Sequence, residues 1–314
     1  MTGYMIRRFL LMILTLFGMS ILIFVMLRLV PGNISDILFD SAGFVDPAAK
    51  AELEAELGLD KPIYIQYWNW ISGLMVGDLG YAYVSEQPAI DEIAPRIPLT
   101  AKLAALALFF SVLFGVPLGV ISAVKQDTWL DYFLRVVSLS GLSLPSFWLG
   151  LLVLTAFVQW FGWIPIYTDK PETLWDELVI LSIPAAAVGF RASALIMRLT
   201  RSSMLEVMRQ DYIRTARAKG LGKRTIVSRH VMRNAMLPMI TVLGPIIPDL
   251  ITGSIFIEAI FRVPGLGRFW VTSTFERDYP MIIGLVMLWA VLIAITYLIT
   301  DILYAFVDPR VRYR

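Results

Sequence analysis

The chain contains no cysteine and only one histidine. Without cysteine there is no disulfide framework, no thiolate nucleophile and no cysteine metal site, and a single histidine leaves no histidine cluster for a metal. Charged residues are also scarce, at 17% of the 314 residues, whereas 58% are hydrophobic and the mean hydropathy is +0.71. So apolar a composition excludes an ordinary soluble domain and indicates a protein of the lipid bilayer.

Long apolar runs are the next feature of the sequence. A helix needs about 20 mostly apolar residues to cross the hydrocarbon core of a bilayer. About six runs are long enough, at residues 9–30, 101–124, 132–160, 179–197, 235–257 and 281–307. The third run is longer than one crossing needs and contains Pro145, which predicts a tilt, a kink or a re-entrant portion. The expected fold is therefore all-α, with about six transmembrane helices.

The distribution of Lys and Arg predicts the orientation in the membrane. With the N-terminus inside, two of these residues precede the first run, two lie around 125–135, ten lie in the loop 198–234 and three in the tail 308–314, which is 17 of the 27. Because basic residues concentrate on the cytoplasmic side, both termini are expected to be cytoplasmic. The predicted organisation is an N-terminal transmembrane anchor (1–30), an extracytoplasmic segment (31–99), a helical core (100–307) containing the loop 198–234, and a cytoplasmic tail (308–314).

The extracytoplasmic segment is acidic and shows signals for one short helix. Asp46 is a suitable N-cap, Pro47 suits the first helical position, and Gly58 suits the C-terminal cap. A helix between these residues is therefore predicted.

The stretch DYIRTARAKGLGKRTIVSRHVMRNAMLP, residues 211–238, stands out between two apolar runs. After Asp211 it contains no further acidic residue but seven basic ones, Arg214, Arg217, Lys219, Lys223, Arg224, Arg229 and Arg233. One interpretation is a topology signal that also attracts anionic lipid headgroups. The internal order of the stretch favours a second interpretation, a docking element.

Local signals within this stretch predict two short helices. Asp211 can cap a helix that runs to about Lys219, and Gly220 and Gly222 then break it. Residues Lys223–Met236 can form a second, amphipathic helix. Ala216 and Gly220 are one helical turn apart and have almost no side chain, so we expect them to form a face that another protein approaches closely.

Sequence motifs for catalysis are incomplete throughout the chain. If Gly222–Lys223 in GLGKRT (220–225) belonged to a phosphate-binding P-loop, position 217 would have to be Gly and position 224 Ser or Thr. The sequence has Arg217 and Arg224 instead. GLGRFW at 265–270 lacks the last glycine of a dinucleotide-binding fingerprint, and Ser143 does not stand in a nucleophile elbow. We therefore expect no catalytic residue, no metal site and no cofactor in this chain.

The segment RTARAKG at 214–220 resembles the EAA loop of inner-membrane permease subunits of ABC importers, whose consensus is E-A-A, three residues, then glycine. Arg214 stands where the family has glutamate, and Leu237–Pro238 lies further from Gly220 than in the general consensus. Both departures are similar to the dipeptide and oligopeptide branch. The resemblance continues in LVPGN (29–33), LGLDKP (57–62), GDLG (77–80), RIPLT (96–100), SLPSFWLG (143–150), EAIFRVPGLGR (258–268), RDYP (277–280) and DPRVRY (308–313). The long segment 31–99 resembles the B member of the permease pair.

This resemblance implies a type I ABC importer permease fold in the bacterial cytoplasmic (inner) membrane. The implied partners are a second related permease, two separate ATPase subunits that bind ATP and Mg²⁺, an extracytoplasmic solute-binding protein and membrane lipid, with no nucleic acid. The implied cargo is a di- or oligopeptide or a glutathione-like molecule. The residues expected to couple the loop 206–233 to the ATPase are Glu206, Asp211, Arg214, Thr215, Ala216, Lys219, Gly220, Lys223 and Arg224.

Two ionisable residues at membrane depth are candidates for the translocation path. Asp249 either pairs with the partner permease or lines the path, where it meets the ammonium group of a peptide. Arg191 either pairs with a carboxylate or reaches the inner headgroups. A different class, the self-sufficient channel or ion-coupled transporter, usually shows paired broken helices with charges in two corresponding halves, and the sequence does not show them. A receptor or scaffold is a third class.

Overall fold

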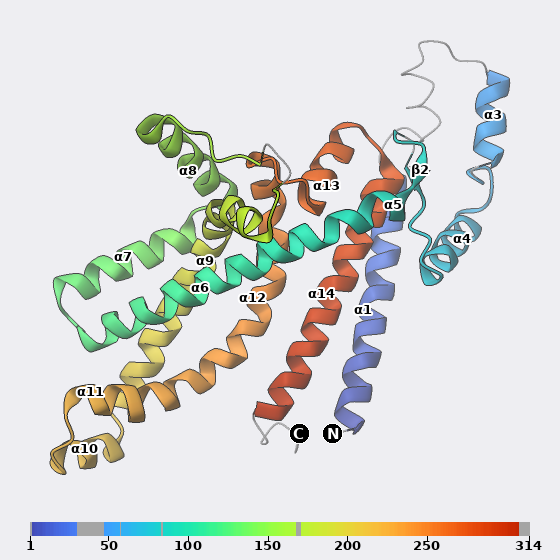
Figure 1. Cartoon of the computed structure of the whole chain (residues 1–314). Coiled ribbons are helices and arrows are strands. Elements are labelled where there is room, and N and C mark those ends of the chain that lie inside the picture. Colours follow the sequence, from blue (N-terminus) through green and yellow to red (C-terminus); the bar gives the residue numbers. More distant parts are fainter. Residues whose placement is uncertain (1, 30–46, 57, 83, 168–170, 308–314) are drawn as a thin grey trace. The chain divides into compact units, whose positions relative to one another are not determined.

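The computed structural model describes residues 2–29, 47–56, 58–82, 84–167 and 171–307, which are mostly helical (Figure 1). The long helices are α1 (Thr2–Leu29), α6 (Ile97–Val124), α7 (Trp129–Ser143), α8 (Ser146–Phe161), α9 (Leu174–Met208), α12 (Met232–Ile260) and α14 (Tyr279–Val307). The short elements are α3 (Pro47–Glu56), α4 (Ile63–Met75), α5 (Ala89–Ile93), the 3-10 helix η1 (Ala94–Arg96), α10 (Asp211–Ala218), α11 (Lys223–Thr225), the π-helix η2 (Ile226–Val231) and α13 (Leu266–Phe275). One antiparallel pair of two-residue strands, β1 (Tyr81–Ala82) and β2 (Gln87–Pro88), completes the described part. The expected all-α fold is confirmed.

Four helical stretches among the described residues are long and apolar enough to cross a membrane. They are Met5–Met26, Ala89–Val124, Leu174–Met208 and Tyr279–Ile302, and the pair α7 and α8 adds a fifth if it forms one span. α12 has 29 residues, which exceeds the length that a crossing needs, but it does not belong to this set. A multi-pass membrane protein is therefore confirmed, while the number of six spans stays a prediction.

The break expected at Pro145 is confirmed. α7 ends at Ser143, α8 begins at Ser146, and their axes differ by 113°. Leu144 is in the extended region, because the ring of a following proline disfavours helical backbone at the residue before it. The third apolar run is therefore two helices at a sharp angle.

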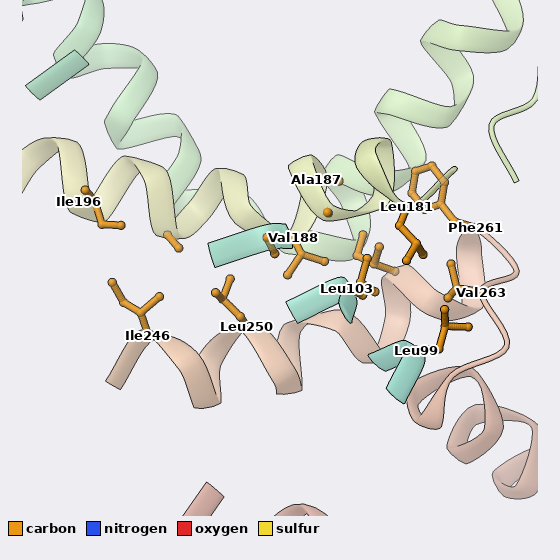
Figure 2. Close-up of a cluster of buried hydrophobic side chains, with 14 residues drawn as sticks. Leu99, Leu103, Leu181, Ala187, Val188, Ile196, Ile246, Leu250, Phe261 and Val263 are labelled. Carbon is orange, nitrogen blue, oxygen red and sulfur yellow. The ribbon is translucent and has the colours of Figure 1, made fainter. Parts of the chain in front are cut away.

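The described residues form two compact units, one within 1–97 and 269–298 and the other within 98–268 and 299–314. In the second unit, α9 packs along α12 through an apolar core. Figure 2 shows Val188 and Ile196 of α9 on the side that faces Leu250 and Ile246 of α12. Leu103 of α6 adds to the same core. Burial of this apolar surface in the protein fixes the relative register of the helices that lead to the basic loop.

Glycines bring α6 and α9 of the second unit into direct backbone contact. A Cβ atom at Gly189 would lie 2.5 Å from the carbonyl oxygen of Ala107, and one at Gly119 would lie 2.6 Å from that of Met197. A hydrogen bond also joins the two helices, because the Ser111 hydroxyl donates to the carbonyl oxygen of Gly189 at 2.9 Å. Small residues at a crossing let membrane helices approach this closely.

The first unit brings the GDLG and RDYP segments together. The Asp278 carboxylate accepts hydrogen bonds from the backbone N–H groups of Val84 and Met281, each at 3.3 Å. A Cβ atom at Gly80 would lie 3.7 Å from Cβ of Pro280. The start of α14 is thereby held against the β1–β2 hairpin.

The short helix predicted in the extracytoplasmic segment is confirmed as α3. It begins at Pro47, and Gly58 follows it with a φ of +64°. The N–H of Leu59 donates to the carbonyl oxygen of Glu54 at 2.8 Å, as expected where glycine ends a helix in left-handed geometry. The proposed N-cap, Asp46, lies outside the described residues.

Candidate functional site

α9 continues through the first part of the predicted loop 198–234. The sequence predicts a span at 179–197, but the helix extends to Met208. Most residues of this extension are good helix formers, so the helix does not end where the apolar run ends. The loop of interest, residues 206–233, therefore begins in the last turn of α9 and ends in the first turn of α12. It is called the basic loop below.

α10 begins at Asp211, but Asp211 does not cap it. Gln210 has extended geometry and occupies the N-cap position, and no side chain caps the helix. Asp211 is the first helical residue, where its negative charge still favours the helix dipole. Its carboxylate lies 3.4 Å from the Arg214 guanidinium, and both side chains are exposed. The predicted N-cap is therefore wrong by one position.

Gly220 ends α10 in the left-handed region, with a φ of +78°. The N–H of Gly220 donates to the carbonyl oxygen of Arg217 at 2.9 Å, and the N–H of Leu221 donates to that of Ala216 at 3.3 Å. These two bonds form a Schellman motif, in which glycine is favoured because it has no Cβ atom. The break predicted at Gly220 is therefore confirmed, and its cause is backbone geometry.

The inner side of α10 packs against the chain itself. The packing residues are Ala123 of α6, Met204 of α9, Ile213 and Ala216 of α10, Ile226 and Val231 of η2, and Ala235 of α12. We call this group the base cluster. Ala216 is only 7% exposed, whereas Gly220 is exposed and nothing lies within 4 Å of a Cβ atom placed there. The predicted joint face of Ala216 and Gly220 is therefore wrong, because Ala216 already has its neighbours within the chain.

The predicted second helix does not stand alone. Lys223–Thr225 form one turn of α11, Ile226–Val231 form the π-helix η2, and α12 follows at Met232 without a break. Ile226 and Val231 are buried, as the amphipathic pattern predicts. π-helical turns are rare and often occur at functional sites. The basic loop thus leads directly into a helix of membrane length.

The outer side of the basic loop carries most of the residues expected to couple to a partner. Glu206, Asp211, Arg214, Thr215, Lys219, Gly220, Lys223 and Arg224 are exposed, and only Ala216 of the predicted set is buried. A pocket of ≈ 440 Å³ opens beside them, lined by Arg201, Ser202, Leu205, Glu206, Arg209 and Gln210. The loop therefore has an apolar anchored side and a charged accessible side. Figure 1 shows its helices α10 and α11 at one end of the second unit.

The two path candidates lie on the surface of the second unit. Asp249 is exposed on α12, on the same side as the exposed Thr252 and Phe256, which follow at helical spacing. Arg191 is exposed on α9. Charged groups at membrane depth normally face protein or water. Both positions are compatible with a path or a subunit interface.

A buried carboxylate that gives no local sequence signal lies near the basic loop. The Asp131 side chain is completely buried, and its two oxygens accept bonds from Nε and Nη2 of Arg201, each at 2.8 Å. The Ser122 hydroxyl donates to the same carboxylate at 2.5 Å, and the backbone N–H of Asp127 donates at 3.1 Å. Nε of Arg135, which is more exposed, lies 3.7 Å away. The contacts join the ends of α6 and α9 to the start of α7.

A second buried carboxylate, Glu258, closes the EAIFRVPGLGR segment. One of its oxygens accepts from the backbone N–H groups of Gly267 at 2.7 Å and Arg268 at 3.3 Å, and the other accepts from the Ser254 hydroxyl at 3.1 Å. The Thr100 hydroxyl accepts a hydrogen bond from the backbone N–H of Leu266 at 2.9 Å. One carboxylate oxygen thus holds the turn after α12, and the other is bonded within α12 itself. This residue has a structural role.

The described residues contain no group of three His, Cys, Asp or Glu side chains that could hold a metal ion. Two carboxylates near the basic loop, Asp131 and Asp211, are paired with arginines, Arg201 and Arg214. The geometry of the loop is that of a docking surface, with an apolar base and an accessible charged side.

Comparison with known proteins decides the family. Residues 115–313 match the binding-protein-dependent transport system inner membrane component, and residues 1–104 match the N-terminal model of the membrane component of such systems. The chain belongs to this family. The permease family model thus includes the basic loop and α12, and the expected resemblance to ABC importer permeases is confirmed.

Full-length relatives of this permease have names from the peptide branch. It is 36% identical to the dipeptide transport system permease protein DppB of Alkalihalophilus pseudofirmus and 38% identical to the oligopeptide transport system permease protein AppB of Bacillus subtilis. It is also 38% identical to the glutathione transport system permease protein GsiC of Escherichia coli. Each match covers 100% of both chains.

Two solved structures share the fold of the permease. A chain of the MetNI methionine ABC transporter in inward facing conformations has a TM-score of 0.56 at 17% identity, over 69% of this chain and 96% of that one. A chain of an amino acid ABC transporter with histidines has a TM-score of 0.54 at 15% identity, over 68% and 93%. The expected permease fold is confirmed. The family match and the full-length relatives support a permease subunit of an importer over a self-sufficient channel or ion-coupled transporter.

Proposed function

We propose that this permease imports di- or oligopeptides, or a glutathione-like cargo, as one subunit of an ATP-driven ABC importer of the bacterial inner membrane. The names of three full-length relatives, which are 36–38% identical, support a small-peptide cargo. A second related permease completes the translocation path, and an extracytoplasmic solute-binding protein delivers the cargo to the segment 31–99. Both termini lie in the cytoplasm.

The observation that carries this proposal is the two-sided basic loop. Its inner side is fixed to α6, α9 and α12 by the base cluster, and its outer side is charged and accessible. An element anchored in this way moves its helices when a partner moves it. Two ATPase subunits, which alone bind ATP and Mg²⁺, dock on the outer side. Their closure tilts α9 and α12 between inward-open and outward-open states, and the permease itself performs no chemistry.

The test compares the permease alone with the complete transporter in proteoliposomes. Alone, it is expected to hydrolyse no ATP, because its sequence lacks a P-loop. With the second permease, the ATPase subunits and the binding protein loaded with peptide, ATP hydrolysis should rise together with peptide uptake. Hydrolysis by the isolated permease, or uptake that needs no ATPase subunit, would contradict the proposal.

The proposed orientation gives a labelling prediction that the absence of native cysteine makes simple. Ser228→Cys lies in the basic loop and Ala48→Cys lies in α3, and both positions are exposed. An impermeant thiol reagent is expected to label Ser228→Cys only from the cytoplasmic side and Ala48→Cys only from outside, because basic segments stay inside. The parent chain without cysteine is the control, and the reverse pattern would overturn the topology.

Asp249 provides a prediction about cargo recognition. We propose that it lines the path, with Thr252 and Phe256 on the same exposed side of α12, and attracts the ammonium group of a peptide. Asp249→Asn should then lower the uptake of peptides with a free amino terminus by about 3- to 10-fold, with little effect on N-acetylated peptides. Equal losses for both peptides would instead indicate a contact with the second permease.

A further inference from the structure

The Asp131 site ties α7 to α9 with a fixed geometry. Two parallel hydrogen bonds from one guanidinium to one carboxylate allow only a narrow range of relative positions, unlike apolar contacts, over which helices can slide. Ser122 and the N–H of Asp127 occupy further acceptor positions of the same carboxylate. The Asp131 carboxylate is therefore held by hydrogen bonds from α6, from α9 and from the turn between α6 and α7.

This site and the base cluster are adjacent on two helices. Ser122 bonds to Asp131, and the next residue, Ala123, packs in the base cluster. Arg201 bonds to Asp131, and Met204, three residues later on the same face of α9, also packs in the base cluster. The Asp131 site and the base cluster are therefore within one helical turn of each other on both α6 and α9.

The remainder of α7 has weaker polar connections to α9. The Ser138 hydroxyl donates to the carbonyl oxygen of Ala194 at 2.9 Å, which is a single neutral bond. α7 itself does not touch the basic loop through the base cluster, since none of its residues belongs to that cluster. Within the described part of the chain, the charged connection between α7 and α9 is thus the Asp131–Arg201 pair.

We propose that Asp131 and Arg201 are positioning residues that carry the movement of the basic loop to α7 and, through the sharp bend, to α8. This inference rests on the proposed function, because it requires the loop to be moved by an ATPase. It assigns the pair a role in the ratio of transport to ATP hydrolysis. A purely structural pair would change the yield of assembled transporter and leave that ratio unaltered.

The experiment measures peptide imported per ATP hydrolysed by the complete transporter in proteoliposomes. Arg201→Lys keeps the charge but cannot donate two parallel bonds, and Asp131→Asn keeps the shape but removes the charge. Both are expected to lower the ratio at least about twofold in complexes that assemble, while ATP hydrolysis continues. Ser138→Ala, which removes the neutral bond between the same helices, is the matched control and should keep the wild-type ratio.

The outcomes separate this inference from the function on which it rests. If the wild-type transporter shows no peptide-stimulated hydrolysis, the proposed function fails and the inference fails with it. If wild type is coupled and Arg201→Lys has the wild-type ratio, the inference alone is wrong. Asp131→Asn leaves the Arg201 charge without its partner and therefore tends to lower the yield, so Arg201→Lys remains decisive if Asp131→Asn does not assemble. An equal loss of ratio in Ser138→Ala also contradicts a specific role for the pair.

Discussion

Gly220→Leu is expected to insert into the membrane normally and to lose at least about tenfold in ATPase association and in peptide-stimulated hydrolysis. Two effects act together. Gly220 has a φ of +78°, which costs a residue with a side chain roughly 1–2 kcal/mol. The position is also exposed, with nothing within 4 Å of a Cβ atom, so a leucine would project from the surface on which we place the ATPase. Pull-down of the ATPase and transport in reconstituted membranes measure both effects.

Three further variants separate backbone geometry from the charge of the loop. Gly222 also has open space around it but an ordinary φ of −65°, so Gly222→Ala should be close to wild type. Gly220→Asn should retain more coupling than Gly220→Leu, because asparagine tolerates left-handed geometry better. Arg224→Gln should weaken coupling only partly, since one exposed ion pair contributes about 0–1 kcal/mol.

Wild-type coupling in Gly220→Leu would show that the basic loop is only a topology signal. Its charge count is the same in this variant, so the positive-inside rule and attraction to anionic lipid predict no loss. The coupling of Gly220→Leu therefore distinguishes the two interpretations of the basic loop: a docking element predicts a loss, and a topology signal predicts none.

Gly189→Ala is expected to reduce the amount of folded permease sharply, although alanine is the better helix former. The new Cβ atom would lie 2.5 Å from the carbonyl oxygen of Ala107 and 2.9 Å from the Ser111 hydroxyl, so α6 and α9 would have to separate. Overpacking of this kind costs about 1–3 kcal/mol. The fraction of permease that survives heating in detergent, measured by size-exclusion chromatography, should fall.

Gly253→Ala is the matched control for this prediction. At Gly253, on α12, the nearest atom to a new Cβ is Cγ1 of Val188 at 4.0 Å, which is an ordinary contact. The variant should be neutral or more stable by up to about 1 kcal/mol, which is the helix propensity difference between the two residues. If both variants lose or gain stability alike, the close contact of α6 with α9 does not limit the packing.

The features that could be predicted from the sequence depend on the chemistry of one or two residues. Proline has no N–H and disfavours helical backbone before it, so the break near Pro145 is predictable wherever the surrounding chain lies. Glycine is favoured at left-handed positions, so the end of α10 at Gly220 is predictable too. The orientation of Ala216 was not predictable, because it depends on Ala123 and Met204, which come from other helices.

Asp131 shows a second reason why part of the site could not be predicted. Its partners Ser122 and Arg201 are 9 and 70 residues away in sequence, and next to Lys125 and Asp127 a further aspartate looks like an ordinary turn residue. Only the packing of α7 against α9 brings the carboxylate to the guanidinium. In contrast, the exposed charges of the basic loop could be predicted from the sequence, because an exposed charge does not depend on residues from other helices.

The base cluster limits how partner choice can be transplanted between permeases. Ile213 and Ala216 pack against residues from α6, α9, η2 and α12. The position of the charged outer side of α10 therefore depends on this packing. A chimera that exchanges residues 211–222 alone would set a foreign helix on a native base, with cavities or clashes where the two differ. The smallest unit that we expect to carry ATPase specificity into another permease is therefore the loop together with the ends of those helices. Such a graft has discontinuous boundaries in sequence but forms a single block in space.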